Sequence, residues 1–123
     1  NLPSFKNLKG KVAREAKKGF IKGLDGRKLL IRSEHSALNT LLQSAGSIVM
    51  KHALVVFNNA LGYKDAHFVA NVHDEWQLEV KEDIAPMVGS LGIKSIILAG
   101  EDLELNCPLD GEYKIGNNWS ETH

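Results

Sequence analysis

The chain has 123 residues, of which 43% are hydrophobic and 24% charged, so it is long enough to form one compact domain with a core. Nothing in it resembles a signal peptide or an apolar run long enough to cross a bilayer, which predicts a soluble protein of the cell interior without membrane contact. The single cysteine, Cys107, excludes an internal disulfide and is expected to be a small buried residue near a strand.

The net charge of zero hides a strong asymmetry along the chain. Residues 1–32 carry ten basic and two acidic side chains, a balance of +8, and the remaining residues carry five basic and thirteen acidic ones, a balance of −8. A basic segment joined to an acidic one suits a protein that meets phosphate on one side and metal ions on the other. An ordinary solvated helix attached to an acidic domain would have the same charges.

The first predicted element is a helix over residues 4–19. Ser4, which follows Pro3, is expected to open the helix, and glycine at 19 or 23 is expected to close it.

A tight turn at residues 23–27 follows, between short strands at Ile21 and at residues 29–31. From Ser33, the expected N-cap, to about residue 60 the apolar side chains recur at helical spacing and form a wide apolar face.

A β-hairpin is predicted around His73-Asp74-Glu75, because apolar, β-prone runs at residues 68–72 and 76–80 flank this polar break. The two carboxylates would then lie at the hairpin tip. Carboxylate oxygens are ligands that Mg²⁺ prefers, so such a tip can hold a hard cation. A solvated turn without a metal site could also have the sequence His-Asp-Glu.

The last elements are expected to be a helix over about residues 82–99, loosened by Gly89 and Gly92, and a strand pair at residues 103–107 and 112–115. The order of elements predicts a mixed α and β fold.

A stripe of neutral donors marks the long helix. His35, Asn39 and Gln43 are four residues apart, so they lie along one side of it. A solvent face usually mixes Lys and Glu, and both are missing from residues 36–50. Such a stripe suits the DNA minor groove, where purine N3 and pyrimidine O2 offer acceptors at similar places in every base pair.

Four blocks in order resemble the family A DNA polymerases, the DNA polymerase I family, and its phage branch in particular. Residues 32–46 look like the helix that follows the fingers in that family, and residues 23–27 look like the turn before it. His73-Asp74-Glu75 matches motif C, and residues 116–123 look like the family's Gly-x-Asn-Trp ending with its terminal His.

The resemblance implies an α+β fold in which an antiparallel palm sheet with the motif C hairpin packs against helices. Residues 1–32 would be the C-terminal part of the fingers subdomain, and residues 33–123 the C-terminal part of the palm. The implied activity is template-directed DNA synthesis by nucleotidyl transfer from a dNTP to a primer 3′-hydroxyl.

The resemblance also implies roles for single residues. Asp74 and Glu75 would be catalytic and would lie at a two-Mg²⁺ site, with Glu75 in a supporting role, and His73 would lie by the primer end. The residues implied in DNA binding are Arg32, His35, Asn39 and Gln43. Glu75 also favours a DNA polymerase over the single-subunit RNA polymerases that share the palm.

The motif A Asp and the fingers helix with its Lys and Tyr are missing from these residues. We therefore expect this chain to be a C-terminal piece of a polymerase that is inactive alone. Its expected partners are an N-terminal polymerase fragment, primer-template DNA and dNTP. Its expected location is the cytoplasm, which would be that of the host if the protein is phage-encoded. Exposed surface that the missing parts would cover predicts a dimer or higher oligomer of the isolated piece. Two alternatives are a non-catalytic nucleic-acid-binding or interaction module and a metal-dependent phosphohydrolase.

Overall fold

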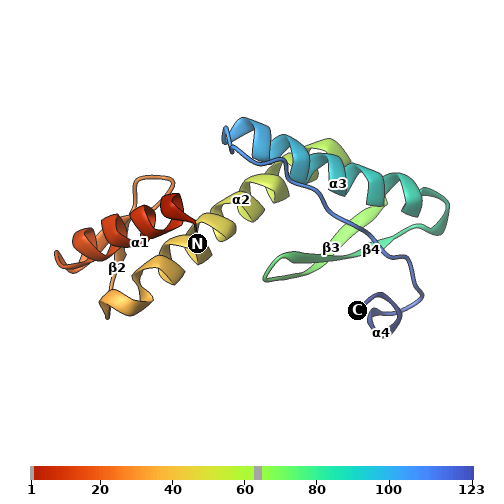
Figure 1. Cartoon of the computed structure of the whole chain (residues 1–123). Coiled ribbons are helices and arrows are strands. Elements are labelled where there is room, and N and C mark those ends of the chain that lie inside the picture. Colours follow the sequence, from red (N-terminus) through yellow and green to blue (C-terminus); the bar gives the residue numbers. More distant parts are fainter. Residues whose placement is uncertain (1, 63–64) are drawn as a thin grey trace. The chain divides into compact units, whose positions relative to one another are not determined.

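The computed structural model describes residues 2–62 and 65–123, which form helices and two small antiparallel sheets (Figure 1). The α+β class is therefore confirmed. The chain divides into two compact units, Asn1–Ile48 and Val49–His123. The elements in chain order are α1 (Pro3–Ala16), β1 (Phe20–Lys22), β2 (Lys28–Leu30), the 3₁₀ helix η1 (Glu34–Ser36), α2 (Ala37–Leu61), β3 (Ala66–Val72), β4 (Glu75–Val80), the 3₁₀ helix η2 (Glu82–Ile84), α3 (Ala85–Asp102) and α4 (Trp119–Thr122).

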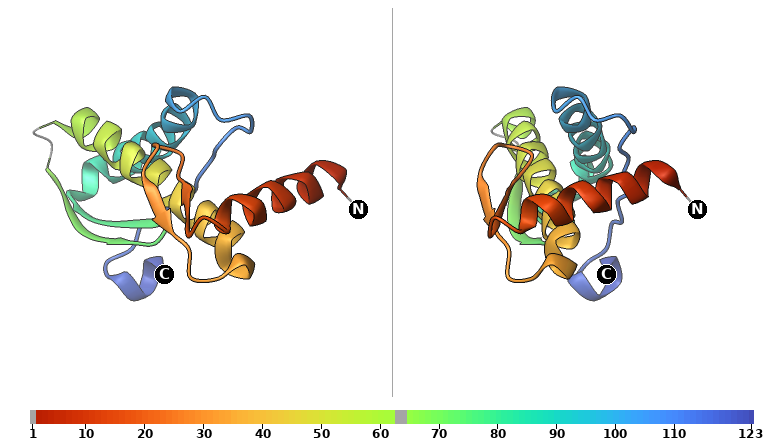
Figure 2. Two further views of the ribbon diagram at one scale, coloured as in Figure 1. Left: turned by 90° about the vertical axis from the view of Figure 1, so that its left-hand side faces the viewer. Right: turned by 60° about the vertical axis from the view of Figure 1, so that its left-hand side comes forward.

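The first unit is built from α1, the β1–β2 hairpin and the beginning of α2 (Figure 2). Pro3 is the first residue of α1, where its missing N–H costs no helical hydrogen bond. Ser4 lies inside the helix, so its prediction as the opening residue was wrong. Burying the apolar stripe of α1 against the hairpin forms the core of this unit, made of Val12, Ala16, Ile21 and Ala37.

The turn between β1 and β2 has the predicted tight geometry. The amide of Gly23 donates to the carbonyl of Arg27 over 2.8 Å, and the Asp25 carboxylate accepts from the Arg27 amide and from its guanidinium. Gly26 has a φ of 83°, a left-handed conformation in which a side chain would be strained.

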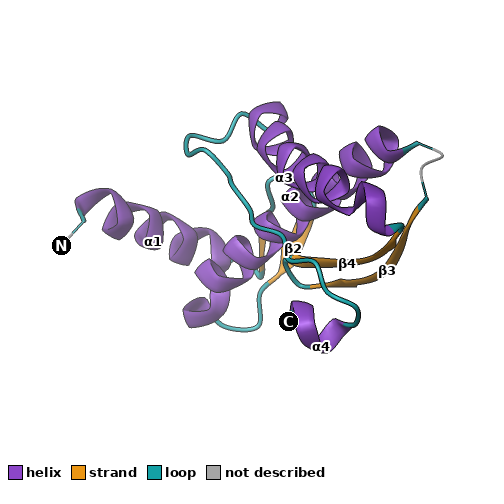
Figure 3. Cartoon of the chain, turned by 90° about the vertical axis from the view of Figure 1, so that its right-hand side faces the viewer, coloured by secondary structure: helices purple, strands orange, loops and turns teal. Residues whose placement is uncertain are grey.

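The second unit packs the end of α2 and all of α3 on the β3–β4 hairpin, which both Figure 1 and Figure 3 show lying along the two helices. Phe57 is the centre of its core: its ring lies 5.4 Å from that of Phe68, edge to face, and 5.4 Å from that of Trp76. Gly92 lets α3 approach closely, because a Cβ there would lie 3.3 Å from the Phe57 ring.

The strand pair predicted at residues 103–107 and 112–115 is absent, since the described chain has no strand after β4. The segment from residue 103 to 118 runs back along α3 instead (Figure 1). Leu109 lies against Gly100, and Tyr113 lies against Gly89. The helix surface at these glycines accepts apolar side chains, and this packing replaces β pairing. Cys107 is exposed, so its predicted burial was also wrong.

We expect Gly89→Ala to destabilise the second unit, because the new Cβ would lie 2.4 Å from Cδ2 of Tyr113. The matched control is Gly46→Ala, where a Cβ meets nothing within 4 Å. Both changes replace a helical glycine by alanine and raise helix propensity equally. The difference in the free energy of unfolding between the two variants, about 1–3 kcal/mol, therefore measures the clash of the new Cβ with Tyr113. Urea unfolding measures this difference, and faster amide exchange over residues 109–116 should accompany it. Equal stability of the two variants would show that Tyr113 does not depend on Gly89.

By length and composition, Glu34–Leu61 and Glu82–Asp102 would each qualify as a membrane-crossing helix, so the prediction that no apolar run is long enough was wrong. The core helices of soluble proteins pass the same test. Of the apolar windows in these two stretches, 11% and 28% are buried, and the buried core residues that they supply are Phe57 and Leu61 from the first and Val88 from the second.

Candidate active site

The predicted hairpin is confirmed, with His73 and Asp74 as its two-residue loop and Val72 paired with Glu75 at its mouth. His73 has a φ of 54°, a left-handed value that His adopts more readily than most residues. Two-residue loops with positive φ match the twist of the flanking strands. The loop thus holds Asp74, whose side chain is exposed, at the outermost point of the hairpin.

The alternation of β4 separates a core face from a polar face. Trp76 and Leu78 pack with Phe57 and Val88, whereas Glu75 and Gln77 point the other way. The apolar contacts of β4 therefore anchor the strand that begins at Glu75, and they leave the Glu75 side chain on the opposite, polar face.

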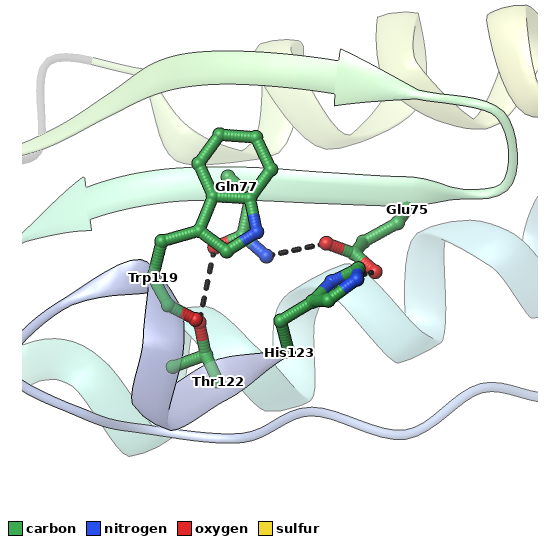
Figure 4. A network of polar contacts seen from close by, with 5 residues as sticks. All are labelled: Glu75, Gln77, Trp119, Thr122 and His123. Atoms are coloured by element: carbon green, nitrogen blue, oxygen red, sulfur yellow. Dashed lines mark hydrogen bonds and ion pairs between the residues drawn. The ribbon is translucent and has the colours of Figure 1, made fainter.

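Glu75 lies in a network of polar side chains that joins β4 to the C-terminal helix α4 (Figure 4). The amide Nε2 of Gln77 donates to Oε1 of Glu75, and Nδ1 of His123 lies 3.5 Å from Oε2. The hydrogen bond from Gln77, with contributions from His123 and Lys114, holds the pKa of Glu75 below its usual value despite an opposing effect of burial.

The network continues into the short helix α4, which is held by its own caps. The side chain of Asn118 accepts from the amide of Glu121 over 3.2 Å, and the Glu121 carboxylate accepts from the amide of Asn117 over 2.7 Å. The rings of Trp119 and His123 contact each other with centroids 6.4 Å apart. Thr122 donates from its hydroxyl to Oε1 of Gln77 over 3.3 Å.

Asp74 lies at the hairpin tip with its carboxylate open to a cation. It makes no hydrogen bond or ion pair with any residue in the described ranges, whereas both oxygens of Glu75 have protein partners. Among the described residues, no group of three or more His, Cys, Asp or Glu side chains is arranged so that it could hold a metal ion. The exposed carboxylate oxygens of Asp74 are ligands of the kind that Mg²⁺ prefers, and further ligands would have to complete the metal site.

The predicted groove-contacting residues lie in the first unit and are all exposed. Asn39 and Gln43 lie one turn apart on α2, His35 lies in η1, and Arg32 lies in the bend before it. Within the described part of the chain, their side chains form no hydrogen bond with protein groups. The hairpin tip belongs to the second unit.

Sequence reasoning missed Gln77 and Thr122 as neighbours of the hairpin tip. The period of two along β4 would have placed Gln77 on the face of Glu75. No sequence signal pointed to Thr122, because its contact with Gln77 spans 45 residues.

The family model described as DNA polymerase family A matches residues 8–121. Proteins described as DNA-directed DNA polymerase from Enterobacteria phage T3 and Escherichia phage T7 are each 40% identical over 116 residues, 87% of this chain and 16% of theirs. A DNA-directed DNA polymerase of Escherichia phage Phieco32 is 34% identical over 130 residues, 98% of this chain and 21% of its own. The chain thus spans a small part of the length of these relatives.

A solved structure, the POL domain of Pol1 from M. smegmatis in complex with DNA primer-template and dNTP, is similar with a TM-score of 0.68. It is 21% identical, and the match covers 76% of this chain and 19% of that one, so it shows a shared fold. The family match and the phage relatives show more: this chain belongs to DNA polymerase family A.

Proposed function

We propose that this chain contributes motif C and a minor-groove contact surface to template-directed DNA synthesis, as the C-terminal part of a family A polymerase. The observation that carries the proposal is the exposed Asp74 at the tip of a β-hairpin, in a chain of this family. In this proposal residues 1–32 belong to the fingers and residues 33–123 to the palm.

Asp74 would hold catalytic Mg²⁺ through its open carboxylate, with Glu75 beside it in a supporting role. The bound cations would activate the primer 3′-hydroxyl and stabilise the leaving pyrophosphate. His73 precedes the ligand in the loop and would lie by the primer end. The sequence holds no Asp-Tyr-Ser segment of motif A, so a second Asp would come from an N-terminal polymerase fragment.

The stripe of His35, Asn39 and Gln43 would donate hydrogen bonds to minor-groove acceptors of the primer-template duplex, and Arg32 would bind a phosphate. The exposure of all four side chains supports this role. The similar M. smegmatis domain was solved with primer-template DNA and dNTP, which supports the same two partners for this chain.

The surface of the isolated chain supports self-association. Large apolar side chains are highly exposed in both units, among them Leu2, Leu30 and Val69 at 71%, 83% and 63%. Such surface promotes association when its usual cover is missing. We propose a homo-oligomer for the isolated chain, and a cytoplasmic location.

The two alternatives differ in their support. A non-catalytic DNA-binding module remains a second candidate, because the basic first unit would bind DNA without any chemistry. A metal-dependent phosphohydrolase needs several ligands in one chain, and no observation among the described residues favours it.

Adding an N-terminal family A fragment with motif A and the fingers helix tests the proposal. The mixture should extend a primer only with Mg²⁺ and with both fragments present, and each fragment alone should be inactive. DNA binding by the mixture without nucleotide incorporation, when a polymerase control run in parallel is active, would favour the non-catalytic module.

We expect Gln43→Ala in the reassembled polymerase to slow extension while leaving thermal stability almost unchanged, because the side chain is exposed. Loss of one groove hydrogen bond should cost about 1–3 kcal/mol where the site excludes water and about 1 kcal/mol where it does not. The loss should be similar for every primer-terminal base pair, since all four pairs present acceptors at similar positions.

The matched control for Gln43→Ala is Asn59→Ala, an exposed amide further along α2. Single-turnover extension from matched and mismatched ends measures both variants. An equal effect of the two changes, or unfolding caused by Gln43→Ala, would show that Gln43 does not contact the groove.

A further inference from the structure

The polar face of β4 is tied to α4 by a chain of three side chains, drawn in Figure 4. Thr122 contacts Gln77, and Gln77 contacts Glu75, which is the first residue of β4 and adjoins Asp74. The contacts of this chain lie on the face opposite the apolar core.

The chemistry of the groups fixes the direction of each hydrogen bond. A carboxylate only accepts, so the amide nitrogen of Gln77 has to face Glu75 and its oxygen has to face Thr122. The hydroxyl of Thr122 must then donate. Its hydrogen has a competing acceptor in the carbonyl of Trp119, 3.1 Å away, so the contact with Gln77 depends on where α4 lies.

The other oxygen of Glu75 is contacted by the residue that follows this short helix, since Nδ1 of His123, the C-cap of α4, lies 3.5 Å from it. Both oxygens of Glu75 are thus oriented through groups whose positions depend on α4. Gln77 and Thr122 are only partly buried, so their contribution to core packing is small.

We propose that Gln77 and Thr122 are positioning residues, through which α4 holds the carboxylate of Glu75 in a fixed direction at the edge of the catalytic hairpin. The inference rests on the proposed function. In this proposal neither residue contacts substrate. Thr122 orients Gln77, and Gln77 orients Glu75, so that the Glu75 side chain is kept away from Asp74. Misplacement of a catalytic-site group by about 1 Å can lower a rate strongly, so positioning contacts affect turnover more than substrate binding.

The test compares Thr122→Val, which keeps the shape but removes the donor, with Thr122→Ser, which keeps the hydroxyl. Ser120→Ala serves as a control change in α4 outside the chain of contacts. In the ¹⁵N-labelled 123-residue chain, the side-chain amide signals of Gln77 report on its two hydrogen bonds without any need for activity. Thr122→Val should shift these signals and speed exchange of the amide hydrogens, and Thr122→Ser and Ser120→Ala should not.

In the reassembled polymerase, Thr122→Val should lower kcat for single-nucleotide incorporation about 2- to 10-fold, which is the rate change expected from the loss of one ordinary hydrogen bond. The KM for dNTP should change by less than about 2-fold, because the contact does not bind substrate. Thr122→Ser should restore kcat.

The inference is overturned if Thr122→Val leaves the Gln77 signals unchanged, if Thr122→Val and Thr122→Ser behave alike, or if kcat stays the same while the signals shift. Failure of the unsubstituted assembly to incorporate nucleotide would count against the proposed function instead, and the amide signals of the isolated chain would still decide whether Thr122 orients Gln77.

Discussion

Asp74→Asn is expected to lower nucleotide incorporation by the reassembled polymerase about 10²- to 10⁴-fold, because a ligand of a catalytic cation supplies several kcal/mol of transition-state stabilisation. The amide keeps the size of the side chain but loses the negative charge. Since Asp74 is exposed and unpaired among the described residues, the free energy of unfolding should change by less than about 0.5 kcal/mol.

The control for Asp74→Asn is Glu79→Gln, which removes an exposed carboxylate from the same hairpin at a position away from the tip. Rapid-quench incorporation and urea unfolding measure the two effects. If Asp74→Asn and Glu79→Gln have equally small effects on incorporation, Asp74 does not hold the cation.

The largest expected effect on stability is that of Phe57→Ala, about 3–5 kcal/mol in the free energy of unfolding of the second unit. Phe57 is 2% exposed, and its ring contacts Phe68 and Trp76 while Gly92 packs against its edge. Removing the ring leaves a cavity between a helix and a sheet that cannot close without moving both.

Val55→Ala is the matched control for Phe57→Ala, because Val55 lies on the same helix but is 59% exposed, and it should cost little. Fluorescence of Trp76, which packs on Phe57, follows the urea transition of this unit. A loss below about 1 kcal/mol for Phe57→Ala would mean that the core is centred elsewhere.

Local signals were sufficient where one element determines its own geometry. The hairpin at His73-Asp74 was predictable because a period of two on both sides of a short polar break favours a pair of antiparallel strands. The shift of register between Phe68 and Ala70 was not predictable from that alternation. The helical spacing after Ser33 predicted α2 in the same way, although its first turn is the 3₁₀ helix η1.

Local signals failed where a segment packs on a distant element. Residues 103–107 and 112–115 have apolar residues typical of strands, yet Leu109 and Tyr113 lie against glycines of α3. The propensity for a strand is weak, and burial of apolar surface on a neighbouring helix is enough to override it. Cys107, expected to be buried near a strand, lies exposed in this segment.

The sequence by itself therefore determined the family resemblance, the mixed class and the candidate residues, because each depends on residue order over short stretches. Only the tertiary structure decided which residues surround Glu75. Gln77 reaches it through strand alternation, and Thr122 and His123 reach this face of β4 from a helix more than forty residues away in the chain. Such contacts depend on how the C-terminal segment packs across α3, and no local pattern encodes that path.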